Sequence, residues 1–178
     1  MKKLFTLLAL TISFSMNAQM TDNSSGTSAS GTNAVAMGDG TTASGSVSTA
    51  MGALTTASGI LSTAMGYQTT ASGYASTAMS YQTTASGNYS KAMGRETTAS
   101  GNYSIAMGRE TTASGKYSIA MGRNTTASDF GSTVIGRYNS SGSSATSADS
   151  FSTSAPAFVV GNGADSSNKS DAFKVMFN

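Results

Sequence analysis

Apolar and polar positions follow one another along this chain with a fixed period of fourteen residues. A methionine stands at every fourteenth position from Met37 to Met121, Ile135 takes the next place, and alanine or valine precedes each of them. Seven residues after each of these alanines, from Ala36 to Ala120, comes a second alanine, flanked by threonine and serine. A short period of constant length indicates that each unit is one structural step stacked on the last.

Each unit predicts two short strands separated by glycine turns. Thr49-Ala50-Met51 and Thr56-Ala57-Ser58 are each followed by a glycine, and most of the other units repeat this spacing. Glycine supplies the unusual backbone angles that tight corners need. A helix would require apolar residues three and four positions apart and would lose about 1 kcal/mol at each glycine. The pattern therefore predicts an all-β fold, a flattened parallel β-roll of about eight coils.

Alternation within the strands assigns the faces of this roll. Ala50 and Ala57 point to one side, whereas Met51 points to the other. A coil of fourteen residues encloses little space, so the alanines are the expected interior. Stacked at about 4.8 Å per coil, the methionines would form an outer apolar stripe about 38 Å long. Such a stripe is not expected on a soluble monomer and predicts contact with further copies of the chain.

The residues that this interpretation places at the interface between copies are Val35, Met37, Met51, Met65, Met79, Met93, Met107, Met121 and Ile135. The opposite register, with methionine inside and alanine outside, would remove the need for a partner. The sequence leaves both registers open.

Five segments are expected along the chain. Residues 1–18 read as a signal peptide, because Lys2 and Lys3 precede an apolar stretch that ends near Ala18. This stretch is too short to span a bilayer as a helix, and no second apolar segment predicts a membrane span. The remaining segments are a polar lead-in (19–28), the repeats (29–138), a Ser/Ala-rich linker (139–156) and a short β tail (157–178).

The composition leaves little room for catalysis. The chain has no histidine and no cysteine, and its carboxylates stand singly, so acid–base chemistry, thiol nucleophiles and disulfides lack their usual residues. Asp39 and Asp165 are lone turn carboxylates, too few oxygen donors for calcium. Without Lys2 and Lys3 the basic and acidic residues balance, and nucleic-acid binding is not expected. The prediction is a non-enzyme without metal or cofactor.

The corners vary where the strands do not, and they are the expected ligand face. Glu96 and Glu110 follow arginines in equivalent positions, which predicts a salt-linked exposed edge. The tyrosines at the other corner could alternatively serve only to stack on one another. The candidate ligand-face residues are Tyr67, Tyr81, Tyr89, Tyr103, Tyr117, Arg95, Arg109 and Arg123.

The repeats resemble a known family. Asn33-Ala34-Val35-Ala36-Met37-Gly38 is similar to the N-S-V-A-I-G repeat of trimeric autotransporter adhesins of the YadA type, and the resemblance extends from residue 29 to residue 138. It implies a left-handed β-roll, a homotrimer, and an adhesive head that is at the cell surface, associated with the outer membrane, or secreted. Members of this family bind host or matrix proteins such as collagen. Here methionine, whose side chain is more adaptable in packing, replaces the family's usual isoleucine or valine.

Two other functions fit the same pattern. The Thr/Ser rows would form a flat hydroxyl and methyl array, as on some ice-binding solenoids. An inert spacer that lifts another domain from the surface is the third hypothesis.

Overall fold

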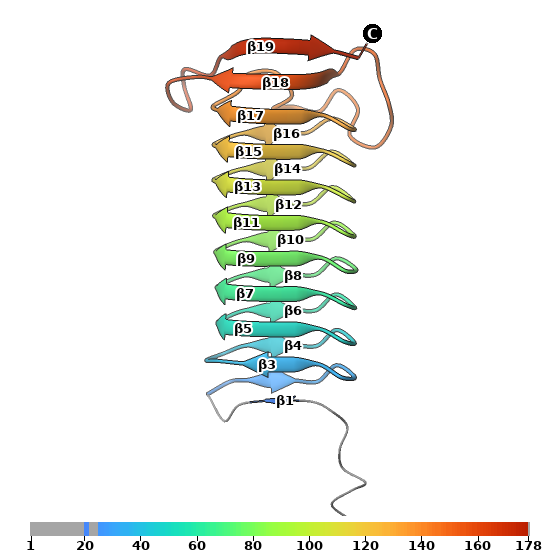
Figure 1. Ribbon diagram of the computed structural model, residues 1–178, viewed down its shortest axis with the longest axis vertical. Helices are drawn as coiled ribbons and strands as arrows, with labels where there is room; N and C mark the ends of the chain where they lie inside the picture. Colours follow the sequence, from blue (N-terminus) through green and yellow to red (C-terminus); the bar gives the residue numbers. More distant parts are fainter. Residues whose placement is uncertain (1–19, 22–24, 178) are drawn as a thin grey trace, which may run out of the picture.

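The repeats wind into a narrow roll with one sheet on each side. The computed structural model describes residues 20–21 and 25–177, so the predicted signal peptide lies outside the described residues. In Figure 1 the nearer strands run to the left and the fainter strands behind carry the chain back as it climbs, which makes the coil left-handed. Over the described residues all regular elements are strands. The predicted all-β roll of about eight coils is confirmed.

Two sheets form the walls of the roll. Over the repeats, residues that pair between neighbouring parallel strands of a sheet are fourteen positions apart in the sequence, so Met65 pairs with Met51 and Met79. The strands of the wider sheet, sheet A, are β1 (Met20–Thr21), β3 (Val35–Met37), β5 (Thr49–Ala53), β7 (Thr63–Tyr67), β9 (Thr77–Tyr81), β11 (Lys91–Arg95), β13 (Ile105–Arg109), β15 (Ile119–Arg123), β17 (Thr133–Arg137), β18 (Pro156–Asn162) and β19 (Asp171–Met176). The strands of sheet B are β2 (Ser28–Ala29), β4 (Thr42–Ala43), β6 (Thr56–Ala57), β8 (Thr70–Ala71), β10 (Thr84–Ala85), β12 (Thr98–Ala99), β14 (Thr112–Ala113) and β16 (Thr126–Ala127).

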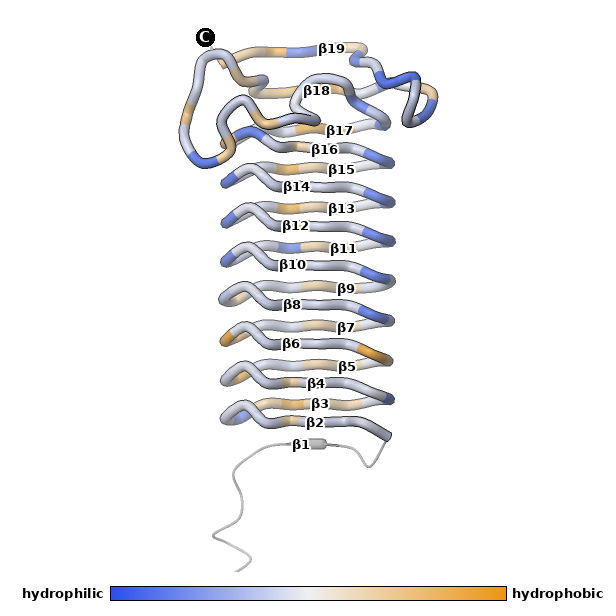
Figure 2. The backbone as a smooth tube through the Cα atoms, turned by 180° about the vertical axis from the view of Figure 1, so that it is seen from behind, coloured by the Kyte–Doolittle hydropathy of each residue, from blue (hydrophilic) through white to orange (hydrophobic). Residues whose placement is uncertain are grey.

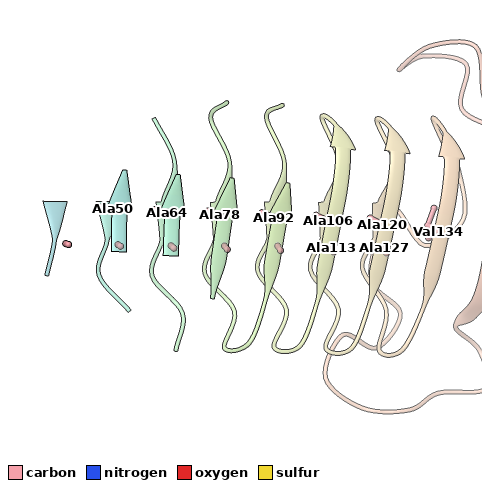
Figure 3. Packing of buried hydrophobic residues seen from close by; sticks show 14 of the residues in the cluster. Ala50, Ala64, Ala78, Ala92, Ala106, Ala113, Ala120, Ala127 and Val134 are labelled. Carbon is pink, nitrogen blue, oxygen red and sulfur yellow. The ribbon is translucent and has the colours of Figure 1, made fainter. Parts of the chain in front are cut away.

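Alanine fills the space between the sheets. Every alanine of the two repeat positions, from Ala36 to Ala127, is fully buried, and Figure 3 shows them stacked coil upon coil. The register with alanine inside is therefore right, and the alternative with methionine inside is wrong. Val134 and Val159 take the place of alanine in β17 and β18, beyond the last strand of sheet B, and both are fully buried.

Two rows of hydroxyl side chains share this interior, which the sequence interpretation did not foresee. Thr55 stands two residues before Ala57, and Ser62 two residues before Ala64, so the period of two points them inward with the alanines. Their equivalents in the other coils are buried as well. At the ends of the rows, Thr41 donates to the Gly38 carbonyl (3.2 Å) and Ser132 to the Asp129 carbonyl (2.9 Å). Small residues of both kinds allow the close approach of the sheets.

The left-handed backbone of the corners is carried largely by residues other than glycine. Leu61 and Tyr103 have φ angles of 59° and 60°, and Gln82 and Glu96 have φ angles of 52° and 55°. The expectation that glycine supplies these corner angles was therefore wrong in part. The glycine after each methionine does have a positive φ, for instance 118° at Gly52. The second glycine of each unit does not.

That second glycine is required by the stacking of the coils. A Cβ atom on Gly87 would lie 2.1 Å from the carbonyl oxygen of Gly101 in the next coil. Asp129 occupies the same position in the last unit, just after the final strand of sheet B, and a side chain is accommodated there. Its carboxylate accepts from the amides of Thr146 and Ser147 at 2.5 and 2.8 Å.

The C-terminal segment closes the end of the roll. β18 pairs in parallel with β17, and β19 folds back antiparallel on β18, which confirms the predicted β tail. The segment predicted as a linker runs across this end (Figure 1). Its Asn139 side chain binds both the amide and the carbonyl of Thr126, at 2.8 and 2.9 Å, in place of a neighbouring strand. The boundaries between the predicted segments stay a prediction.

Candidate binding surfaces

An apolar stripe follows the outer face of sheet A. Met51 and the methionines above it are partly buried against their neighbours, whereas Met37, near the N-terminal end, is 38% exposed. Val35, Ile105 and Ile119 extend the stripe sideways, and Lys91 takes the same row beside Met93. All the predicted interface residues therefore lie on one face.

The stripe continues into the C-terminal hairpin. Val160 pairs with Ile135, and Phe173 of β19 pairs with Val160, so these side chains share one face of the sheet. Phe173 is 54% exposed. Phe158 and Val175 form the parallel row and widen the stripe at this end. Sequence reasoning missed these residues because the offset from β17 to β18 breaks the fourteen-residue period.

One corner of the roll carries stacked planar groups. The rings of Tyr67 and Tyr81 stack with centroids 5.4 Å apart, and the Arg95 guanidinium lies 5.6 Å from the Tyr81 ring. Tyr81 and Arg95 line a shallow, open hollow. Arg109, Arg123 and Arg137 follow Arg95 in register along the next three strands. This corner ridge is thus aromatic in its lower part and cationic above.

Carboxylates neutralise part of this ridge. Arg95 pairs with Glu96 at 3.0 Å and Arg109 with Glu110 at 2.9 Å, which confirms the predicted salt-linked edge. The Asn124 side chain donates to Glu110, and this hydrogen bond, together with Arg109, lowers the pKa of Glu110. Within the described residues Arg123 has no carboxylate at ion-pair distance, because asparagine occupies the glutamate position after it.

The opposite corner carries a ladder of aromatic rings. Tyr89, Tyr103 and Tyr117 stack in that order, with centroids 4.9 and 5.0 Å apart. Tyr74 and Phe130 meet the two ends of the ladder edge-on. Neither was among the predicted site residues, although both stand one position before the tyrosine row in their own units. These tyrosines do stack on one another, and each residue remains about half exposed, so stacking leaves them accessible to a ligand.

The two corners do not form one surface. Figure 2 shows polar residues gathered along both edges of the roll, with the sheets between them. Tyr67, Tyr81 and the arginines lie on one edge, and the tyrosine ladder lies on the other. The predicted ligand-face residues therefore form two separate ridges.

Sheet B presents the hydroxyl face. Thr56 and Ser58 point outward on either side of the buried Ala57, and the serine is exposed. The threonines of successive strands pair in register from Thr42 to Thr126. The predicted outward direction of these rows is correct.

Titratable residues do not gather into a centre in the part of the chain that the structure covers. No group of three or more Asp or Glu residues is placed to hold a metal ion within the described ranges. Nor does any helix there have the length and apolar character needed to cross a membrane. The surfaces available are ridges and faces that repeat from coil to coil.

Comparison with known families agrees with this geometry. A model for the YadA head domain repeat, built on two copies of the repeat, matches residues 29–55, 57–79, 85–111 and 113–139. Together these segments cover more than half of the chain and coincide with the coils. No curated protein matches the chain. The chain therefore belongs to the family of YadA head domain repeats, which are surface-exposed, non-enzymatic domains of trimeric autotransporter adhesins.

Proposed function

We propose that this protein is an exported, non-catalytic adhesin head that assembles as a homotrimer and binds a host, matrix or surface ligand through its repeats. The observation that carries this proposal is the apolar stripe on sheet A, in which Met37 and the methionines above it, then Ile135, Val160 and Phe173, pair one with the next across neighbouring strands. A stripe of this length on a soluble protein is expected to be covered. Family membership favours two further copies of the same chain as the cover.

Burial of the stripe supplies the energy of assembly. A methionine side chain contributes about 1.5–3 kcal/mol when it moves from water to an apolar environment. The methionines are partly buried within one chain already, so each contributes less than this on association. Repetition over successive coils makes the sum sufficient for a stable trimer.

The oligomeric state tests this proposal. Met79→Lys combined with Met93→Lys places two charges in the middle of the stripe. We expect light scattering or sedimentation to find a trimer for the wild type and a monomer for the double variant. Circular dichroism should find the same strand content in both, because the alanine interior is untouched.

A matched control uses the opposite face of the same coils. Thr84→Lys with Thr98→Lys adds the same charges to sheet B, where we expect the trimer to persist. A wild type that sediments as a monomer would overturn the assembly argument, as would equal loss of assembly in the control.

We place ligand binding on the two ridges. The ridge with Tyr81 and Arg95 combines an exposed ring, a guanidinium and a shallow hollow, and aromatic and arginine side chains are enriched at interface centres. Collagen is the first ligand to examine. Tyr81→Ala with Arg95→Ala should weaken binding to immobilised collagen at least tenfold, whereas Ser86→Ala on sheet B should not change it. If collagen is not bound by the wild type, other matrix proteins are examined with the same pair of variants.

The hydroxyl face supports one alternative. The in-register threonines of sheet B form the regular array that ice binding requires. Thermal hysteresis or inhibition of ice recrystallisation by the wild type, lost in Thr84→Lys with Thr98→Lys, would favour this function over adhesion.

A further inference from the structure

The tyrosine ladder brings three reactive rings together on the surface. Tyr89 and Tyr103 are 4.9 Å apart between centroids and inclined by 7°, and Tyr103 and Tyr117 are 5.0 Å apart and inclined by 15°. Their exposed fractions are 45%, 46% and 46%. The rings are therefore close to one another and also accessible to reagents in solution.

The backbone of the roll holds this arrangement. The three tyrosines have φ angles of 59°, 60° and 61°, so they leave the chain in the same direction. The Tyr103 amide donates to the Asn88 carbonyl at 2.7 Å, and the Tyr117 amide donates to the Asn102 carbonyl at 2.9 Å. Because these bonds join successive coils, the separation of the rings is imposed by the stacking and persists as the side chains move.

Cations distinguish the pairs of tyrosines. Lys116 Nζ lies 5.3 Å from the centroid of the Tyr117 ring, and the Arg95 guanidinium lies 5.6 Å from that of Tyr81. A positive charge over a ring stabilises its electrons and opposes the removal of one. Within the described residues no cation lies over Tyr89 or Tyr103. These two rings also form the closest and most nearly parallel pair.

We propose that Tyr89 and Tyr103 are an oxidative modification site, at which a one-electron oxidant of the peroxidase class joins adjacent coils through a dityrosine bond. This inference rests on the ladder alone and does not depend on the proposed adhesive function.

The reaction balances with hydrogen peroxide as oxidant. Each phenol loses one electron and its hydroxyl proton, and the two radicals form one carbon–carbon bond between the ring positions next to the hydroxyl groups. The hydrogen on each of those carbons is then lost as a proton while the ring oxygen takes up a proton, which restores both phenols. The two electrons and two protons removed in total convert one hydrogen peroxide to two waters.

Such a bond would serve a chain that has no cysteine. Exported proteins meet oxidising surroundings and commonly use disulfides as covalent cross-links. A link between residues fourteen positions apart constrains the unfolded chain as a disulfide loop of that length does. Dityrosine would supply this constraint between two coils that are otherwise held by hydrogen bonds and small side chains.

The test is oxidation of the folded full chain with peroxidase and hydrogen peroxide. Trypsin cleaves at Lys91, Arg95 and Arg109 and separates the peptides that carry the two tyrosines. We expect dityrosine fluorescence, and by mass spectrometry a joined peptide that is two hydrogens lighter than the sum of the Tyr89 and Tyr103 peptides. The oxidised protein should migrate as a single chain on a denaturing gel and unfold at higher urea.

Two conservative variants complete the test. Tyr103→Phe keeps the stacked ring but removes its hydroxyl group. The remaining tyrosines of the pair's neighbourhood, Tyr89 and Tyr117, stand two coils apart, a separation of about 9.6 Å. The Tyr89–Tyr103 product should therefore vanish, and no Tyr89–Tyr117 product should replace it. Tyr67→Phe removes the pair on the other ridge and should leave the ladder product unchanged. Absence of the joined peptide in the wild type overturns the proposal. So does cross-linking that joins different chains instead of adjacent coils.

Discussion

At the scale of single residues, each position of the repeat is governed by its contacts with the coils above and below. The glycine that follows each methionine adopts φ angles of 108° to 128° between residues 38 and 122. Ser80 is the exception in this row and holds a φ of 100°. A residue with a Cβ atom is strained there, because its side chain meets the backbone.

Ser80→Gly should therefore stabilise the roll. Release of strain is worth about 1–3 kcal/mol, from which the greater freedom of glycine in the unfolded chain subtracts about 0.5–1 kcal/mol. We expect a net gain of about 1 kcal/mol, measured as a higher urea midpoint with an unchanged slope.

The control for this substitution is Ser86→Gly, at an exposed position of the same coil where φ is not positive. In that variant only the greater freedom of glycine in the unfolded chain has an effect. The free energy of unfolding is therefore expected to fall by about 0.5–1 kcal/mol. If Ser80→Gly is no more stable than the wild type, the backbone at position 80 is not strained.

At the scale of elements, the end of the roll is closed by carboxylates that hold a polar loop. Asp129 accepts two amides of this loop. Asp171, at the start of β19, accepts the amides of Ser140 and Ser141 at 2.9 Å each and the Ser140 hydroxyl at 2.8 Å. The open edge of sheet B is thereby covered by a loop whose own sequence is too polar to pack as a core.

The hydrogen bonds to Asp171 predict acid sensitivity of this cap. Burial raises the pKa of its carboxyl group, but the hydrogen bonds from Ser141 and Ser140 outweigh that effect and hold the pKa below its ordinary value of 3.8. A carboxyl group whose pKa is lower in the folded than in the unfolded chain stabilises the fold at pH values above its unfolded pKa. This stabilisation declines as the pH falls through the folded pKa. The protection of the amides in residues 139–142 against exchange, relative to an unfolded chain at the same pH, should fall below about pH 4.

Asp171→Asn separates this effect from general acid unfolding. An amide accepts fewer hydrogen bonds, so the protection of the loop against exchange should already be lower at pH 7 and should change little more on acidification. Asp149→Asn is the control, because the Asp149 side chain is exposed and makes no hydrogen bond within the described residues. A loop in Asp171→Asn that stays protected at pH 7 would contradict this account of the cap.

At the scale of the whole molecule, the roll is a stack in which each coil contacts only its neighbours. Its stability is then approximately a sum of terms for single coils and for the contacts between them. Because the coils repeat, each coil adds one equivalent set of side chains to every face and ridge of the roll.

Deletion of two coils should shorten the rod without unfolding it. Removal of residues 54–81 joins Ala53 to Gln82 and preserves the fourteen-residue phase. Small-angle scattering should find a rod about 10 Å shorter. An adhesin loses part of its ligand affinity with the missing rungs, Tyr67 and Tyr81 among them, whereas an inert spacer keeps its role and only changes its length. Unaltered attachment by the shortened protein would favour the spacer.

The sequence by itself determined the path of the chain over most of its length. Its period defined the coils, the alternation around Ala50 and Ala57 placed alanine and methionine on opposite faces of the strands, and the neighbouring positions of Arg95 and Glu96 predicted their ion pair. These features follow from local rules, because successive coils are in contact and the same pattern is applied again at each step. The alternation alone left open whether methionine or alanine was inside; the narrow separation of the two sheets decided for alanine.

Only the tertiary structure decided the features that depend on more than one unit. The left-handed corners occupied by Tyr103 and Glu96 are imposed by hydrogen bonds to the previous coil. The extension of the methionine stripe to Phe173 arises from an offset that breaks the period. Tyr67 and Tyr81 share one edge with the arginines, and the ladder of Tyr89, Tyr103 and Tyr117 lies on the opposite edge, because each coil turns twice. A periodic sequence specifies how one step stacks on the next, whereas the ends of the stack and the composition of its surfaces are set by contacts between residues distant along the chain.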